Sequence, residues 1–139
     1  MKNRAAQILA LGITLTAVAA VYARTKIMTA DVPFSFHVSS MVMPQGVYTV
    51  SETTDGAIAW IKPIQEQSAK AVATMNVVAN HRIQAMLVFH RVGQEYFLAE
   101  IWAGDGSTGR ALPPATLEKE LTRNGAATSL AVVRVALHR

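Results

Sequence analysis

The chain has 139 residues, of which 51% are hydrophobic and 16% are charged. This length fits a single domain with one hydrophobic core, and the low charged fraction excludes a disordered chain, a coiled coil or a nucleic-acid-binding tail. The sequence contains no cysteine, which excludes disulfide bonds, a thiol nucleophile and thiolate metal sites.

The first 23 residues have the three parts of a secretory signal peptide. Lys2 and Arg4 form the positive end, residues 5–23 form an uncharged apolar run, and Val21-Tyr22-Ala23 has cleavage-site chemistry. We predict a signal helix over 1–23 that is cleaved after Ala23, with Val18-Ala19-Ala20 as a second possible cut. The alternative is a retained membrane anchor, because this apolar run is about long enough to cross a bilayer.

Both alternatives place residues 24–139, one β-rich domain, outside the cytoplasm, either in the periplasm or secreted. The whole chain has 13 Lys and Arg against 9 Asp and Glu, and two of the basic residues belong to the leader. The remaining basic excess is too small to predict a polyanionic partner, so we expect no nucleic-acid binding.

The first half of this domain predicts three strands. Residues 32–38 alternate apolar and polar side chains, with Pro33 favouring an edge or a strand start. Residues 41–46 read as a connection, and a second strand follows over Val47–Glu52. The dipeptide Asp55-Gly56 then predicts a hairpin turn into a third strand at about Ala57–Ile64. Its register sets Val50 opposite Ile61 and Ser51 opposite Trp60.

The central part of the chain predicts the strongest hairpin. In Ser68–Val78 helix and strand compete, and the β-branched residues favour a strand. Gln84–Val92 and Glu95–Ala103 are joined by Gly93-Gln94, which suits a two-residue turn. This register pairs Phe89 with Leu98, Arg91 with Tyr96 and, on the opposite face, His90 with Phe97. Both faces are largely apolar, so we expect a helix to cover the outer one.

One helix and a last strand complete the expected fold. The helix runs over about Pro114–Asn124, with Leu117 and Leu121 on one face and Asn124-Gly125 as its stop. Leu130–His138 alternates again and reads as a closing strand, with Ala131, Val133, Val135 and Leu137 on one face. The fold class is therefore mainly all-β: a single antiparallel meander of about 6–8 strands that forms a small barrel or sandwich.

Four segments carry a resemblance to a known family. They are Val32-Pro33-Phe34-Ser35-Phe36, then 43–50 (MPQGVYTV), then 87–98 (LVFHRVGQEYFL), and then Ile101-Trp102 with the Gly-rich stretch to Arg110. In this order the segments resemble a family of small exported bacterial proteins. Family members often carry Gly where this chain has Ser39, and Ala where it has Gln45. The resemblance implies export and a compact β-rich domain, and it assigns no activity, cofactor or catalytic residue.

The segment Gly104–Gly109 matches the pattern G-x-G-x-x-G of dinucleotide-binding turns. That fingerprint requires a helix that opens at its glycines within a parallel βαβ unit. Here Arg110-Ala111-Leu112-Pro113-Pro114 intervenes, and the neighbouring strands read as antiparallel. We therefore interpret the segment as a surface loop that binds no nucleotide.

The four histidines are candidates for a metal site. His37, His81, His90 and His138 lack the short spacings of zinc-hydrolase helices, but strands could bring His37 together with His90 or His81. His37 with Met41 and Met43 is a weaker candidate for Cu(I), since thioether sulfur suits that ion. The favoured interpretation is structural, with surface histidines and with methionines that fill gaps beneath a turn.

Two further arrangements could imitate a functional site. Glu100 is expected between apolar neighbours opposite Leu87, where burial would make it a candidate acid, although the favoured interpretation is that it reaches solvent or pairs with Arg91 or Arg110. Arg91 with three aromatic residues, Tyr96, Trp60 and Trp102, could line a basic aromatic groove. We favour cation–π stacking or core packing for these side chains.

The sequence thus predicts no catalytic, cofactor-binding or metal-binding residue. The favoured function is an exported, non-catalytic β-domain that binds an envelope component, a protein partner or an apolar small molecule. Membrane contact is expected only through an uncleaved N-terminal segment. The alternative is a small metal-dependent or hydrolytic extracytoplasmic enzyme. The interior distinguishes them, because a dry core of Phe34, Phe36, Phe89 and Leu98 leaves only the surface for binding.

Overall fold

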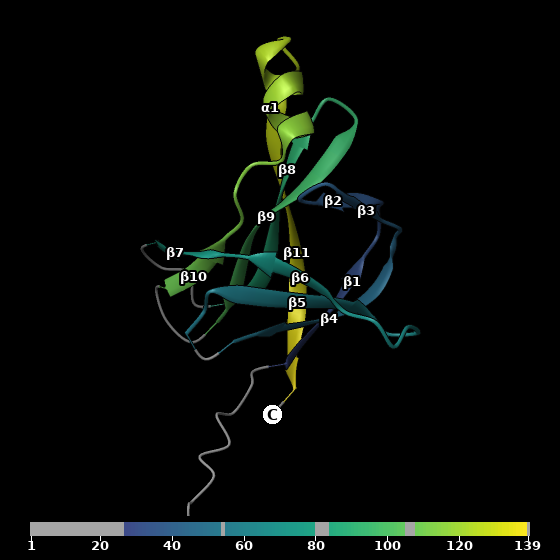
Figure 1. The fold of residues 1–139 in the computed structure, drawn as a ribbon, viewed down its shortest axis with the longest axis vertical. Helices are drawn as coiled ribbons and strands as arrows, with labels where there is room; N and C mark the ends of the chain where they lie inside the picture. The colour runs from purple at the N-terminus through teal and green to yellow at the C-terminus, as the bar shows by residue number, and fades with distance from the viewer. Residues whose placement is uncertain (1–26, 54, 80–83, 105–107, 139) are drawn as a thin grey trace, which may run out of the picture.

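The computed structural model in Figure 1 describes residues 27–53, 55–79, 84–104 and 108–138. The predicted signal helix over 1–23 lies outside these residues. The described part of the chain is mainly β, with eleven strands and one helix. They are β1 (Ile27–Val32), β2 (Phe36–Val38), β3 (Met41–Met43), β4 (Gly46–Glu52), β5 (Ile58–Pro63), β6 (Lys70–Ala73), β7 (Met75–Val78), β8 (Ala85–Val92), β9 (Glu95–Ala103), β10 (Thr108–Ala111), α1 (Thr116–Arg123) and β11 (Thr128–His138).

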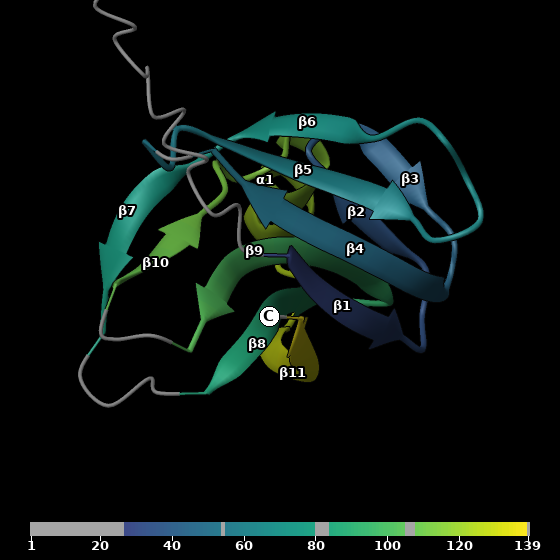
Figure 2. The same ribbon diagram turned by 90° about the horizontal axis from the view of Figure 1, so that it is seen from below.

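The strands form one curled, barrel-like sheet. Its hydrogen-bonded order is β3-β2-β9-β8-β11-β1-β4-β5-β6, and β10 pairs with both β9 and β7. Strand β6 continues through Thr74 into β7, which pairs with β10 (Figure 2). Because β10 also pairs with β9, the two sides of the curled sheet are connected through β10. Of the two expected forms, a barrel or a sandwich, the structure supports the barrel-like one, as a curled half-barrel sheet.

The simple antiparallel meander is wrong in two places. The last strand, β11, pairs with β8 on one side and with β1 on the other. A meander would instead pair β11 with β10, the strand that precedes it in the chain. Strand β2 pairs with β9 in parallel, with His37 opposite Phe97. The expected 6–8 strands become eleven among the described residues because two predicted strands are each divided in two, and because β3 and β10 form in segments that were expected to be a connection and a loop.

Both predicted hairpin registers are confirmed near their turns. Val50 lies opposite Ile61 and Ser51 opposite Trp60 in the β4–β5 pair. In the β8–β9 pair, His90 lies opposite Phe97, and the other two predicted pairs, Phe89 with Leu98 and Arg91 with Tyr96, are also present. Gly93 has a φ of 62°, a left-handed conformation that glycine adopts without steric cost, which explains its place in the turn.

The predicted strand over residues 32–38 is interrupted at Pro33–Ser35. Proline has no N–H to donate to a sheet, so β1 ends at Val32 and the chain resumes as β2 at Phe36. Strand β1 also begins earlier than predicted, at Ile27. The predicted connection after Val38 contains strand β3, which pairs with β2 beyond a turn in which Ser39 has a φ of 54°.

The second long segment, predicted over Ser68–Val78, is also divided. Strands β6 and β7 are separated by Thr74, whose N–H donates to the Ala57 carbonyl and whose hydroxyl donates to the Gly56 carbonyl at 2.6 Å. At this point the chain changes partner: β6 pairs with β5 before Thr74, and β7 pairs with β10 after it. A single interrupted strand thereby connects β5 with β10.

A cluster of aromatic rings packs inside the curled sheet. Phe34 stacks on Tyr96 with 3.9 Å between ring centroids and meets the edge of Phe89 at 5.0 Å. Phe36 contacts Phe89 at 5.3 Å and Tyr48 at 5.2 Å. Leu98 is buried in the same cluster. The predicted packed interior is therefore confirmed for Phe36, Phe89 and Leu98, with Phe34 packed against them.

An ion pair spans this interior from β10 to β4, two strands that are not neighbours in the sheet. Arg110 Nε lies 3.5 Å from Glu52 Oε2, and both side chains are largely buried. Gly56 leaves room for this guanidinium, because a Cβ added there would lie 1.9 Å from Arg110 Cζ. The ion pair ties the two sides of the barrel together.

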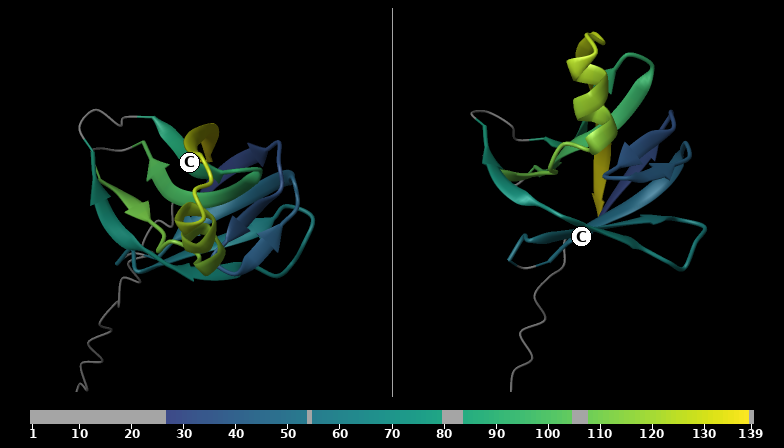
Figure 3. Two further views of the ribbon diagram at one scale, coloured as in Figure 1. Left: turned by 90° about the horizontal axis from the view of Figure 1, so that it is seen from above. Right: turned by 45° about the horizontal axis from the view of Figure 1, so that its top comes forward.

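Helix α1 covers part of the outer face of the β8–β9 hairpin, as predicted. A second apolar cluster, separate from the interior, contains Val92, Phe97 and Ala115, with Leu121 and Ala126 packed against it. The helix begins at Thr116 and is followed by Gly125, which has a φ of 85°. Figure 3 shows the helix at one end of the molecule, beside the yellow strand β11, whose half-buried side chains include Ala131, Val133 and Val135.

Candidate functional site

The structure brings two of the candidate histidines to one row on the outer face of the sheet. Phe97 of β9 lies opposite His37 of β2 and also opposite His90 of β8. Paired residues of neighbouring strands point to the same face, and the alternate residues Phe36, Val38 and Phe89 point into the core. The row His37–Phe97–His90 therefore forms the outer-face candidate site, with the ring of Phe97 between the two histidines.

The first histidine of the row is held by a ring contact and a carboxylate. His37 stacks on Phe97 with 4.7 Å between ring centroids and 19° between planes. Its Nε2 lies 2.7 Å from Oε2 of Glu95, which begins β9. The side chain of His37 is mostly buried, whereas that of Glu95 is half exposed. Strand alternation and the short hairpin turn together place this pair.

The second histidine is joined to the helix. His90 Nδ1 lies 2.6 Å from Oε1 of Glu118, and the Glu118 side chain is only 12% exposed although it belongs to a surface helix. A carboxylate beside Nδ1 accepts a hydrogen bond from the N–H of that atom and leaves Nε2 as the acceptor in the neutral ring. This arrangement orients the imidazole in the way that a histidine base requires.

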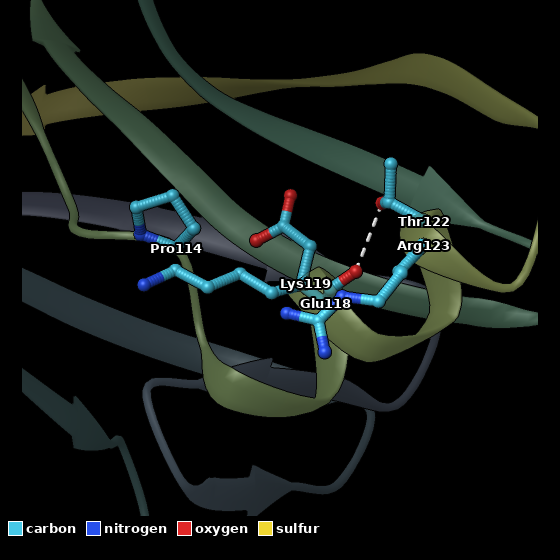
Figure 4. A pocket seen from close by; sticks show the side chains of 5 residues that line it. All are labelled: Pro114, Glu118, Lys119, Thr122 and Arg123. Atoms are coloured by element: carbon cyan, nitrogen blue, oxygen red, sulfur yellow. Dashed lines mark hydrogen bonds between the residues drawn. The ribbon is translucent and has the colours of Figure 1, made fainter.

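A shallow pocket lies beside Glu118 on the helix (Figure 4). It is lined by Pro114, Glu118, Lys119, Thr122 and Arg123. The Thr122 hydroxyl donates to the Glu118 carbonyl at 2.8 Å, a bond internal to the helix. Two cationic side chains thus flank the carboxylate that holds His90.

Among the described residues, the structure does not gather the candidate histidines into one metal site. His37 and His90 share a face, but each faces its own carboxylate and Phe97 lies between them. The described ranges contain no group of three or more His, Asp or Glu side chains that could hold a metal ion. His81 and the side chain of His138 lie outside what the structure describes.

The copper hypothesis is wrong for a simple reason of strand geometry. His37 pairs with Val42 on the outer face, whereas Met43 pairs with Phe36 and Met41 with Val38 on the inner face. Met43 is buried in the core and Met41 packs against it. The interpretation of these methionines as gap fillers is confirmed.

Glu100 does not lie opposite Leu87 as predicted. Ala99 is an extra residue in β9, so the register shifts and Glu100 pairs with Val88, while Leu87 pairs with Ile101. Glu100 Oε2 accepts a hydrogen bond from Trp102 Nε1 at 2.7 Å. Its expected partners lie elsewhere, since Arg110 pairs with Glu52 and Arg91 lies over a tyrosine ring.

The four residues of the hypothetical aromatic groove occupy three places. Arg91 Cζ lies 5.6 Å from the centre of the Tyr96 ring, which confirms cation–π stacking for that pair. Trp102 is buried and contacts Gly109 closely, because a Cβ added at Gly109 would lie 2.6 Å from the indole. Trp60 is exposed on β5. These side chains do not form one groove.

The Gly-rich segment is partly a strand, which corrects the interpretation of all of Gly104–Gly109 as a loop. Thr108 and Gly109 begin β10, while residues 105–107 lie outside the described part. Strand β10 pairs antiparallel with β9, and α1 begins only at Thr116. The glycines therefore do not open a helix in a parallel βαβ unit, as the dinucleotide fingerprint requires.

Two titratable groups outside the row have displaced pKa values. Hydrogen bonds from the Thr53 hydroxyl and then from the Ala57 N–H lower the pKa of Asp55. Burial, followed by the charge of Glu66, raises the pKa of Tyr48, whose hydroxyl donates to the Pro44 carbonyl. Both groups stabilise turns, so neither adds chemistry to the outer-face site.

Sequence reasoning missed the two carboxylates, Glu95 and Glu118. The predicted hairpin register already placed His90 beside Phe97, and the helix was expected to cover this face. Which helical residue would face His90 depends on how α1 is rotated over β8, and no local pattern specifies that rotation. The position of Glu95 beside His37 depends on the parallel β2–β9 contact, which has high sequence separation.

None of the helices among the described residues is long and apolar enough to span a membrane. In comparisons with known proteins, no family model matches the chain, and no curated protein or solved structure shows significant similarity to it.

Proposed function

We propose that this protein is an exported, non-catalytic binding domain that engages a component of the cell envelope through its outer surface. The observation that carries the proposal is the aromatic cluster packed inside the curled sheet. Five rings, those of Phe34, Phe36, Tyr48, Phe89 and Tyr96, contact one another at centroid distances of 3.9 to 5.3 Å. Small-molecule carriers with a barrel fold keep that space open for their ligand.

The outer surface supports the proposal because it exposes apolar side chains. Large hydrophobic residues that are more than a third exposed occur on several strands and on α1: Ile27, Val42, Ile58, Trp60, Ile64, Met75, Val78, Leu117, Leu130 and Val132. Scattered exposed apolar residues are ordinary, whereas residues gathered on one face mark interaction surfaces. The outside of the sheet offers such faces where α1 does not cover it.

The test is to identify what the exported protein contacts in its own envelope. A photo-crosslinking amino acid is placed, one position at a time, at the exposed positions Val42, Trp60 and Leu130 and at the helix position Glu120. Crosslinks to an envelope component from one outer-face position, with none from Glu120, are expected. Native mass spectrometry of the same preparation would contradict the proposal if it found a stoichiometric apolar molecule that is lost only on unfolding.

A small hydrolytic or metal-dependent enzyme is the second candidate, and the His90–Glu118 pair favours it. The carboxylate on Nδ1 leaves Nε2 of a partly exposed imidazole as a proton acceptor. Ester and phosphoester hydrolysis are measured for the purified protein, its metal content is determined, and both are repeated for His90→Ala. Turnover that this variant abolishes, while its fold persists, would replace the binding proposal with the enzymatic one.

A further inference from the structure

A cavity of about 330 Å³ opens at the end of the sheet where β1 and β5 finish and β4 begins. Its walls come from two connections, one between β3 and β4 and one between β5 and β6, which Figure 2 shows at the same end of the molecule. Its lining includes Pro44, Gln45, Val47, Tyr48, Ile64 and Glu66. We call this space the Glu66 cavity.

Hydrogen bonds within the protein fix both walls of the Glu66 cavity. The Ile64 N–H donates to the Val47 carbonyl at 3.0 Å, which holds the connection after β5 against β4. The Glu66 N–H donates to the Pro63 carbonyl at 3.0 Å, and the Tyr48 hydroxyl donates to the Pro44 carbonyl. The walls are therefore formed before a ligand arrives, which lowers the entropic cost of binding.

The lining combines apolar carbon with unpaired oxygen acceptors. Pro44 and Ile64 are exposed to solvent, and Ile64 is 54% exposed, so their carbon atoms can pack against an aliphatic chain. Among the described residues, the side-chain oxygens of Gln45, Gln65 and Glu66, all of which line the cavity, have no hydrogen-bond partner. Ammonium and guanidinium groups carry only donors, so they match these acceptors.

The charge of the lining favours a cation. Glu66 lines the cavity together with no Lys or Arg from the described part of the chain. Its charge acts on the buried end of the cavity, because it adds to the effect of burial in raising the pKa of Tyr48. Asp31, an exposed residue of β1, lies opposite Val47 and places a second carboxylate at the rim.

The neighbouring lysines do not occupy this site. Lys62 lies opposite Thr49 in the adjacent row, and its Nζ donates to the backbone carbonyl of Glu66 at 3.1 Å, not to the carboxylate. Lys70 lies opposite Ile61 at the start of β6. Neither lysine lines the cavity, so the Glu66 carboxylate remains available to a cation from outside.

We propose that the Glu66 cavity receives a basic side chain, lysine or arginine, from a protein partner in the cell envelope. The aliphatic stem packs against Pro44 and Ile64, and the charged end reaches the Glu66 carboxylate. The volume lies at the lower end of the range for small-molecule pockets, roughly 300–1,000 Å³, which suits one side chain of a larger partner. The inference rests on the proposed function and names the chemistry of its envelope partner.

The experiment uses the full chain, purified after export. The backbone amide signals of Gly46 and Ile64 are followed by NMR during titration with the blocked tripeptide acetyl-Gly-Lys-Gly-amide. A second tripeptide replaces its lysine by norleucine, which keeps the aliphatic stem and lacks the ammonium. The lysine peptide should shift both signals saturably and lose affinity when salt is added. The norleucine peptide should bind about tenfold more weakly.

Variants assign the binding to the cavity. Glu66→Gln removes the charge with little change in shape and should weaken binding of the lysine peptide about tenfold, while the norleucine peptide is unaffected. The matched control is Glu120→Gln, the same substitution at an exposed position of α1, which should change neither affinity. Ile64→Ser removes apolar carbon from the wall and should weaken both peptides about threefold.

A photo-crosslinking amino acid at Gln65 identifies the source of the basic group in the envelope. Crosslinks to a protein segment that contains lysine or arginine are expected, and Glu66→Gln should abolish them. Crosslinks to an amine-bearing lipid or saccharide would overturn the protein partner.

Equal binding of the two tripeptides would refute the inference, as would equal effects of Glu66→Gln and Glu120→Gln. Capture of an envelope component at Val42, Trp60 or Leu130, with no crosslink from Gln65, would refute the inference and leave the proposed binding function intact. Conversely, hydrolytic turnover that depends on His90 would refute the proposed function, whatever the peptides show.

Discussion

The imidazole of His90 and the carboxylate of Glu118 form a polar contact between the sheet and helix α1, with 2.6 Å between Nδ1 and Oε1. Around it the helix segment is held by a small apolar cluster in which Leu121 is only partly buried. An eight-residue helix has little stability of its own and depends on such contacts. The contact therefore adds to the apolar cluster in holding α1 on the sheet.

The first prediction concerns this contact. Glu118→Gln should destabilise the domain by about 1 kcal/mol, because a hydrogen bond to a charged group is lost at a partly solvated position. His90→Ala should cost about the same, more than the 0.5 kcal/mol expected of a surface residue. Urea denaturation measures the loss, and hydrogen exchange of α1 locates it. Glu120→Gln, on the exposed side of the same helix, is the control and should change neither measurement.

The second prediction concerns the aromatic interior. Phe89 is fully buried and contacts the rings of Phe34 and Phe36, so Phe89→Ala should destabilise the domain by about 3–5 kcal/mol through lost transfer energy and a cavity. Phe89→Leu keeps most of the volume and should cost roughly 1.5 kcal/mol or less. Chemical denaturation compares both with the wild type. Equal midpoints for Phe89→Ala and wild type would contradict a packed core.

The third prediction is an alkaline loss of stability that depends on Tyr48. Burial, and then the charge of Glu66, raises the pKa of this phenol above 10.0, so the unfolded chain loses the proton first. The stabilisation is complete below pH 10 and is lost as pH rises through the folded-state pKa. The denaturation midpoint should therefore fall more steeply above pH 10 in wild type than in Tyr48→Phe. Parallel curves for the two proteins would contradict the prediction.

The fourth prediction is the corresponding acid effect of Asp55. Hydrogen bonds from Thr53 and Ala57 hold its pKa below 3.8, so the folded state retains the charge after the unfolded state has lost it. The stabilisation is present above pH 4 and disappears as pH falls through the lowered value. Thermal midpoints of wild type and Asp55→Ala should differ at pH 7 and converge near pH 2. A constant difference across this range would count against it.

The fifth prediction concerns Ser39, the single non-glycine residue with positive φ in the described part of the chain. A left-handed conformation costs an L-residue with a side chain about 1 kcal/mol or more, a cost that glycine avoids. Ser39→Gly should therefore stabilise the domain by about 0.5–1 kcal/mol. The neighbouring substitution Ser40→Gly should give no gain, because Ser40 is not in this conformation. Thermal denaturation of both variants provides the comparison.

Local turn chemistry explains which parts of the fold the sequence predicts. Gly93-Gln94 and Asp55-Gly56 each fix a register between adjacent strands, and all pairings derived from them near the turns are present. Farther along the β8–β9 pair, the extra residue Ala99 shifts the register and moves Glu100 away from Leu87. A bulge of this kind satisfies packing on both faces of β9, and alternation alone does not locate it.

Features that depend on distant segments were not predicted. The sequence predicts a loop where β10 begins, because residues 108–111 contain little apolar alternation. Pairing with β7 and β9 stabilises β10 as a strand. The Arg110–Glu52 ion pair needs the closed sheet to bring its partners together. In the candidate site, the sequence predicts His37 and His90 as candidates and places Phe97 beside His90. Their carboxylate partners, Glu95 and Glu118, depend on the parallel β2–β9 pairing and on the docked helix.

The position of β11 between β8 and β1 has a consequence for how the molecule folds. Strand β11 bonds to β1 over Ile27–Ala30 and to β8 over Met86–Val92, so these two parts of the sheet are joined along β11 only after residue 138 has been made. Pairings between distant segments are slow to form because a long loop must close first. The hairpins on either side of β11 can therefore form early, and the seam between them is made late.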